Sequence, residues 1–170
     1  MGRYVLTARH CINGVAEITG VLTGEHKLRT HEGSEKFYEA KKFYKHPEHD
    51  LAIVELKEPI QLTGNSKARA IPLARISDTK KFHKGTKFGV SGWGDLLPGS
   101  HRGSETLQWV EVPWVPLDVC REAYSHTSYG PVEKDEICAG DLENGGVDSC
   151  QGDSGGNSEQ IYRLDTTSHH

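Results

Sequence analysis

Short apolar or alternating runs, separated by glycine, proline and polar clusters, recur along most of the chain. Runs of this length predict β-strands, and many in succession indicate an all-β sandwich or barrel. The predicted strands are Arg3–Thr7, Ile18–Leu22, Lys36–Phe43, Leu51–Leu56, Thr86–Trp93, Thr106–Val112 and Glu136–Ala139. One short helix is expected at Val119–Tyr124, with Asp118 as a candidate N-cap.

A polar connector broken by Pro59, Gly64 and Pro72 lies between two β-rich stretches. Such a segment suits a boundary between two β units. We therefore expect a first unit over residues 1–70 and a second over residues 71–156. Residues 157–170 are polar and lack strand-like alternation, which predicts a disordered or foreign tail.

The overall charge balance is slightly acidic, with 20 Lys and Arg against 24 Asp and Glu. This leaves no basic field to hold nucleic acid through its phosphates. No apolar run approaches the roughly 18 residues of a membrane span, and the first residues lack the apolar stretch of a signal peptide. Neither nucleic acid nor a membrane is therefore expected as a partner.

The four cysteines are Cys11, Cys120, Cys138 and Cys150. They form no Cys-x-x-Cys pair and do not cluster with histidine, which disfavours a zinc site. Disulfides formed in an oxidising compartment fit the pattern better.

A glycine-flanked serine lies near the end of the chain, in Gly152-Asp153-Ser154-Gly155-Gly156. A serine hydroxyl is a weak nucleophile, so a catalytic one needs a nearby base and donors for the oxyanion that its attack creates. Glycines beside it leave backbone N–H groups unobstructed. The same five residues would also form a good surface turn.

Two further residues could complete a catalytic set. His10 follows a short apolar strand, and a neutral imidazole can take a hydroxyl proton. Asp50 precedes the apolar strand Leu51–Leu56, where its carboxylate could orient an imidazole. The alternatives are a surface histidine, one of ten in the chain, and an aspartate that only caps its strand.

Together these motifs, in the order His, Asp, Ser, resemble the trypsin-like, chymotrypsin-fold serine proteases. The segments Gly89–Gly94 and Glu136–Gly140 also resemble the family, and the likeness covers about residues 3–156. It implies two six-stranded antiparallel β-barrels, both incomplete in this chain. It also implies peptide-bond hydrolysis through an acyl-enzyme, for which no cofactor is required.

The resemblance assigns a role to each motif residue. His10 would be the general base, Asp50 its orienting partner and Ser154 the nucleophile. The backbone amides of Gly152 and Ser154 would form the oxyanion hole. Asp153 would pair with the amine that an activation cleavage creates.

Asp148 stands six residues before Ser154, where trypsin-like members hold the carboxylate of the substrate pocket. A carboxylate there favours a long cationic side chain. The resemblance thus implies polypeptide substrates with Arg or Lys before the scissile bond, and protein protease inhibitors as candidate partners. A solvated aspartate in a turn is the alternative.

The resemblance also extends to structural features. It pairs Cys120 with Cys138 and leaves Cys11 and Cys150 without their family partners. It implies an extracellular, secreted protein, although this chain shows no signal peptide. Glu25, Glu32 and Glu35 resemble the calcium loop of trypsins, with a solvated acidic loop as the alternative.

Several features depart from the family pattern. The chain is shorter than family catalytic domains, so we expect truncation at both ends and open barrels. Arg9 stands where the family has a small residue, which predicts overpacking of about 1–3 kcal/mol or an unpaired charge. Two hypotheses follow: an active endopeptidase, or an impaired fragment or pseudo-protease that lacks the activation N-terminus and the substrate-binding wall.

Overall fold

The computed structural model describes residues 2–13, 18–63, 67–97, 99–128, 131–134, 136–146, 148–156 and 158–160. Contacts divide the chain into two compact units. The first consists of Met1–Leu73, Gly92–Gln108 and Cys150–Gly156, and the second of Ala74–Ser91, Trp109–Ser149 and Asn157–His170. The units are discontinuous along the chain, because the segment that carries Ser154 groups with the first unit.

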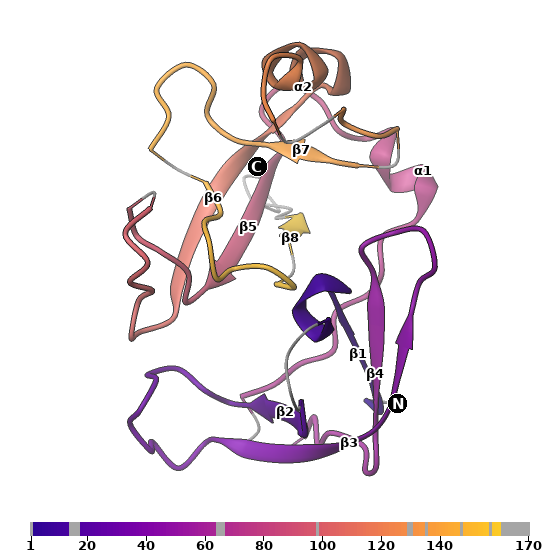
Figure 1. Cartoon of the computed structure of the whole chain (residues 1–170), viewed down its shortest axis with the longest axis vertical. Coiled ribbons are helices and arrows are strands. Elements are labelled where there is room, and N and C mark those ends of the chain that lie inside the picture. Colours follow the sequence, from indigo (N-terminus) through magenta and orange to yellow (C-terminus); the bar gives the residue numbers. More distant parts are fainter. Residues whose placement is uncertain are drawn as a thin grey trace, which may run out of the picture. The chain divides into compact units, whose positions relative to one another are not determined.

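The first unit is built on a four-stranded sheet (Figure 1). Its strands are β1 (Tyr4–Thr7), β2 (Gly20–Thr23), β3 (Lys36–Lys45) and β4 (Ala52–Leu56), in the order β1-β4-β3-β2. All its pairs are antiparallel. Tyr38, Val54 and Leu56 form the buried core, and partly buried residues such as Val5 and Phe43 pack against it. Alternation along β1 and β4 places these side chains on one face.

The second unit also contains a four-stranded sheet, in the order β7-β6-β5-β8. Its elements are α1 (Ile76–Thr79), β5 (Lys87–Gly92), β6 (Gln108–Val115), α2 (Leu117–Tyr124), β7 (Cys138–Ala139) and β8 (Ser158–Gln160). A disulfide between Cys120 and Cys138 joins α2 to β7, which confirms the predicted pair. Closing a loop of 18 residues in this way contributes about 3 kcal/mol of stability.

Every predicted strand overlaps an observed one, but several details differ. The predicted N-cap Asp118 is wrong: Pro116 occupies the cap of α2, and Asp118 lies in the first turn, where a negative charge suits the helix dipole. Three elements were not predicted: the strand β8 and two helical turns, the short helix α1 and the 3₁₀ turn η1 (His10–Ile12). Single helical turns carry too few residues to show a period.

The predicted tail also differs from the structure at its start. Ser158–Gln160 form β8 and pair with β5, with Val90 opposite Ser158. Pairing at a sheet edge uses backbone N–H and C=O groups, so it does not require the apolar alternation that the sequence lacks here. Residue 157 and residues 161–170 lie outside the described part of the chain.

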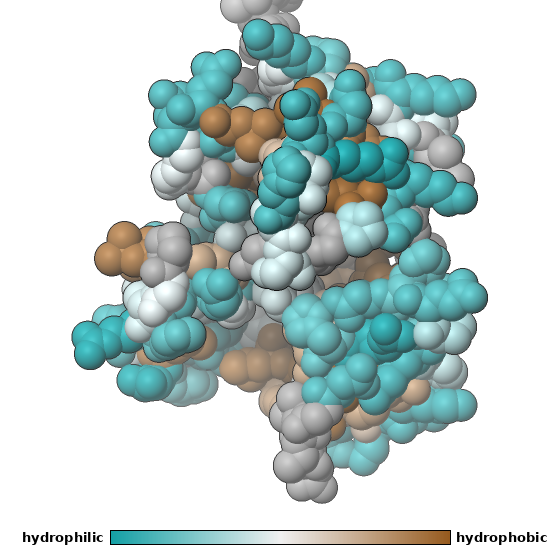
Figure 2. All heavy atoms as spheres, turned by 45° about the horizontal axis from the view of Figure 1, so that its top comes forward, coloured by the Kyte–Doolittle hydropathy of each residue, from teal (hydrophilic) through white to brown (hydrophobic). Residues whose placement is uncertain are grey.

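Two open antiparallel sheets with few helices confirm the all-β class, and each sheet fits an incomplete barrel. Open sheets leave apolar side chains in water: Tyr4 on β1, Leu22 on β2 and Trp109 on β6 are among the exposed large hydrophobic residues. Figure 2 shows hydrophobic residues, in brown, exposed among hydrophilic ones on the face in view. Of the helices in the described ranges, none has the length and apolar character of a bilayer span.

Candidate active site

Strand register in the first unit brings His10 and Asp50 together. β1 and β4 are neighbours, and Thr7 at the end of β1 lies opposite Ala52 at the start of β4. Residues just after β1 and just before β4 therefore meet at one end of the sheet. There His10 Nδ1 lies 2.5 Å from Asp50 Oδ2, and the His10 backbone N–H donates to Asp50 Oδ1 at 2.7 Å.

These hydrogen bonds determine the charge and orientation of the pair. The side-chain bond from His10, with its backbone bond, holds the pKa of Asp50 below its usual value, so the carboxylate is ionised at neutral pH. An ionised acceptor favours the tautomer with the proton on Nδ1, which leaves Nε2 as the base. Both side chains are open to water, 58% exposed for His10 and 52% for Asp50.

The segment around Ser154 folds as two consecutive tight turns. The Cys150 carbonyl accepts from the Asp153 N–H at 3.1 Å, and the Asp153 carbonyl accepts from the Gly156 N–H at 3.0 Å. Gly155 has φ +82°, and a Cβ there would lie 2.5 Å from Thr7 Oγ1. Glycine is thus required at this position for two reasons: its left-handed backbone and its close approach to β1.

Cys11 connects the histidine to the serine segment. Its Sγ lies 3.6 Å from His10 Nε2 and donates to the Ser154 carbonyl at 3.4 Å. The structure therefore brings His10, Asp50 and the Ser154 backbone together within one unit. Within the described residues, no hydrogen bond joins Ser154 Oγ to His10 Nε2, and the N–H groups of Gly152 and Ser154 donate to no acceptor.

Asp153 points away from this cluster into the loop that follows β5. Its carboxylate accepts from the Gly94 N–H at 2.8 Å and from the Cys150 N–H at 3.0 Å. A Cβ on Gly92 would lie 1.9 Å from Asp153 Oδ1, so only glycine leaves room for the carboxylate there. In this structure Asp153 thus binds backbone amides of its own unit.

Arg9 is a positioning residue whose role the sequence did not reveal. Its guanidinium donates from Nη1 to the carbonyls of His46 and Pro47, both at 2.9 Å. The expected unpaired charge is therefore wrong, because the long side chain reaches the loop that leads to Asp50.

Asp148 lies in the second unit, where it lines a cavity of about 420 Å³. Its Oδ1 accepts from the Ser149 N–H at 2.7 Å, and the residue is exposed. Glu136 lines the same cavity, although the sequence marked it only as the start of a strand and of a family-like segment.

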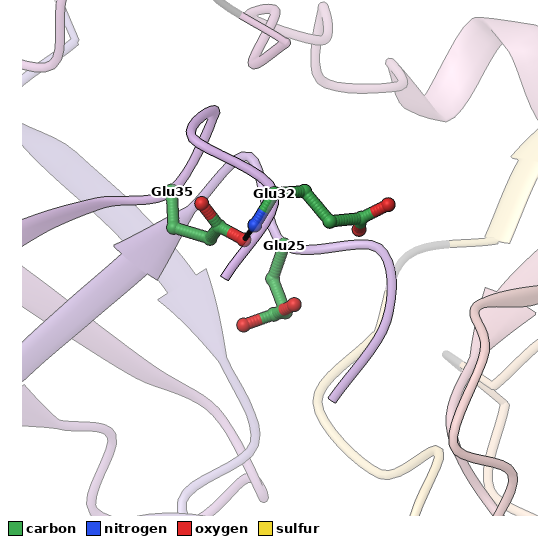
Figure 3. A group of neighbouring side chains, drawn as sticks. All are labelled: Glu25, Glu32 and Glu35. Carbon is green, nitrogen blue, oxygen red and sulfur yellow. Dashed lines mark hydrogen bonds between the residues drawn. The ribbon is translucent and has the colours of Figure 1, made fainter. Parts of the chain in front are cut away.

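The three predicted acidic residues of the first unit do come together. One carboxylate oxygen from each of Glu25, Glu32 and Glu35 lies within 4.8 Å of the others. Figure 3 shows the Glu35 carboxylate meeting the backbone nitrogen of Glu32, at 2.5 Å. Two oxygens bound to one calcium ion at 2.3–2.6 Å can lie up to about 5 Å apart, so this spacing fits the ion.

Backbone amides hold this loop through its carboxylates. The Lys27 N–H donates to Glu32 Oε2 at 3.0 Å, and the Gly33 N–H donates to Glu35 Oε2 at 2.7 Å. The pKa of Glu35 is lowered, chiefly by the bond from the Glu32 amide. His31 Nδ1, 3.1 Å from Glu35 Oε2, would compete with a cation when protonated.

Comparisons with known proteins agree with the fold. The sequence profile of the trypsin family matches residues 1–157. Trypsin-3 of Salmo salar is 32% identical over 160 residues, covering 90% of this chain and 61% of the relative. Serine protease 1 of Rattus norvegicus is 35% identical over 161 residues, covering 91% and 60%. Trypsin V-A of Rattus norvegicus is 37% identical over 161 residues, covering 91% and 59%.

The class of protein that this fold and family define is the serine endopeptidases, which are hydrolases of peptide bonds. The chain belongs to the trypsin family, since the family profile matches most of its length. It spans about 60% of the length of the relatives named above.

Proposed function

We propose that the chain hydrolyses peptide bonds after Arg or Lys, with Ser154 as nucleophile, His10 as general base and Asp50 as its orienting partner. The observation that carries the proposal is the contact of one sulfur, Cys11 Sγ, with both His10 Nε2 and the Ser154 carbonyl. For the reaction, the Ser154 hydroxyl must come within hydrogen-bond distance of His10 Nε2.

In the proposed reaction His10 Nε2 removes the Ser154 proton while Oγ attacks the substrate carbonyl. The N–H groups of Gly152 and Ser154 are offered as donors to the resulting oxyanion, and their lack of acceptors in the described residues supports this role. The imidazolium then protonates the leaving amine. Water then attacks the acyl-enzyme by the same proton transfers and releases Ser154.

Asp148 is proposed to select the substrate through the charge of its carboxylate. Its place on a cavity wall supports this role, because a long cationic side chain could enter and donate to it. Polypeptides with Arg or Lys before the scissile bond are the proposed substrates. Protein inhibitors that present the same side chains are the proposed partners, and an extracellular location follows the family.

A second candidate function is a catalytically impaired member of the family, and Asp153 favours it. The family resemblance gives that carboxylate an activation amine as partner, whereas here it accepts from the amides of Gly94 and Cys150. A loop held in this way could leave the oxyanion donors poorly placed. Losing one such donor typically removes about 2.7–4 kcal/mol of transition-state stabilisation.

One assay separates the two candidates. The purified chain is incubated with an Arg-ended fluorogenic peptide beside the Ser154→Ala variant, with Ser128→Ala as a matched control at an exposed serine. An active enzyme gives turnover that only Ser154→Ala abolishes. Equal rates for all three proteins would show that the chain is a catalytically impaired member of the family.

Calcium is proposed as a structural ligand of Glu25, Glu32 and Glu35. When bound, its two positive charges would offset most of the negative charge of three carboxylates that otherwise repel one another. Ligand binding to the folded state raises the melting temperature, so millimolar calcium should stabilise the chain. Glu32→Gln should reduce the shift, whereas Glu143→Gln, in the other unit, should not. An equal shift in all variants would contradict the site.

A further inference from the structure

The cavity that holds Asp148 belongs wholly to the second unit. Its volume of about 420 Å³ lies in the range of small-ligand pockets. α2 contributes Cys120 and Tyr124 to its wall, and β7 contributes Cys138. Because the disulfide joins Cys120 to Cys138, this wall is covalently fixed. The cavity is thus a built feature of this unit.

The charged residues described on the cavity wall have one sign. Two of the described lining residues are charged, Asp148 and Glu136, and both are acidic. Arg121 lines a neighbouring cavity instead. Its Nε donates to the Val132 carbonyl at 2.9 Å. The cavity therefore favours a cation.

Each of the two carboxylates has one oxygen held by the protein. Glu136 Oε2 accepts from the Glu133 N–H at 2.7 Å, and Asp148 Oδ1 accepts from the Ser149 N–H. Within the described ranges, Glu136 Oε1 and Asp148 Oδ2 accept no hydrogen bond. Each carboxylate thus keeps one oxygen that a cationic ligand could bind.

We propose that Glu136 is a second specificity-determining residue of this cavity, and that it makes the cavity prefer guanidinium to ammonium groups. A planar guanidinium carries five N–H donors and can serve two carboxylates at once, whereas a lysine ammonium acts as a compact point charge. This inference rests on the proposed function, in which Asp148 selects the cationic side chain. It adds a preference for Arg over Lys.

The test measures binding rather than turnover. N-acetyl-arginine amide and N-acetyl-lysine amide are titrated into the full chain carrying Ser154→Ala, and dissociation constants are measured by NMR. Glu136→Gln should weaken arginine binding about fivefold, the effect of one screened, charge-assisted hydrogen bond, and lysine binding less than twofold. Glutamine keeps a carbonyl acceptor for the Glu133 N–H, so the loop should keep its fold.

Matched variants make each outcome decisive. Glu143→Gln removes the same charge from the same unit outside the cavity wall, and should leave both constants unchanged. Asp148→Asn should weaken both ligands. Unchanged arginine binding in Glu136→Gln, equal weakening of both ligands, or no binding to the parent chain would each overturn the inference. If only Asp148→Asn weakens binding, Glu136 is excluded while the proposed function stands.

Discussion

The two ends of β4 carry carboxylates in opposite environments. Asp50, just before the strand, is half exposed and bonds to His10, whereas Glu55, near its end, has a side chain only 8% exposed. Lys41 Nζ and Tyr44 Oη both donate to Glu55 at 2.7 Å. The more buried carboxylate is thus fully satisfied by its own sheet, and the exposed one belongs to the candidate site. Burial alone therefore does not mark function here.

The largest expected effect is a loss of catalysis when Asp50, the exposed carboxylate before β4, is substituted. Asp50→Asn should lower kcat for the Arg-ended peptide by about 10⁴-fold, the loss known for this exchange in the family's triad, because the amide favours the wrong imidazole tautomer. The melting temperature should change little, since Asp50 is exposed. Steady-state kinetics and calorimetry together check both statements. A loss of stability without a kinetic defect would make Asp50 a strand cap.

The second largest effect is a loss of stability when the buried end of β4 is substituted. Leu56→Ala removes a side chain that is 0% exposed and should lower the free energy of unfolding by about 2–5 kcal/mol. Leu22→Ala, at an exposed position on β2, is the matched control and should cost far less. Chemical denaturation measures both. Similar losses would mean that the first unit has no defined core.

A smaller change is expected at Glu55 itself. The pKa of Tyr44 is raised, chiefly by its hydrogen bond to Glu55, so Glu55→Gln should bring it back towards 10. The melting temperature should also fall, but less than in Leu56→Ala. Glu39→Gln removes an exposed carboxylate paired with Lys57 and should change neither quantity. An unshifted Tyr44 titration in Glu55→Gln would contradict the described contact.

The smallest effect concerns the titration of Asp50. Its folded-state pKa is lowered by His10, so its ionised form stabilises the fold above the unfolded value near 3.9. That contribution is lost as pH falls through the folded value. Carboxyl NMR titration should show a higher Asp50 pKa in His10→Ala than in the parent chain. Identical values in both proteins would argue against the pair in solution.

The strands could be predicted because their signal is local. The continuous apolar run Leu51–Leu56 gives β4 directly, and the aromatic-rich run Lys36–Phe43 gives most of β3. The cap of α2 and the turn at His10 could not be predicted in this way. Single turns depend on backbone hydrogen bonds with neighbours rather than on a repeating pattern.

The same distinction applies to the residues of the candidate site: local sequence predicts some of them and not others. Ser154 and its glycines are recognisable because the chemistry of a nucleophile restricts the residues beside it. Arg9 contacts the loop before Asp50, and Glu136 lines the cavity of Asp148. In both cases the partners are separated along the chain. No local signal marks such partners.

By itself, the sequence determined the all-β class, the kinship with trypsins and the residue types available for chemistry. Only the tertiary structure decided that the segment of Ser154 groups with the unit of His10, and that Cys11 lies between them. The physical reason is that strand formation depends on neighbours along the chain. The meeting of residues 10 and 154 depends on sheet register and on packing at Gly155, which exist only once the chain has folded.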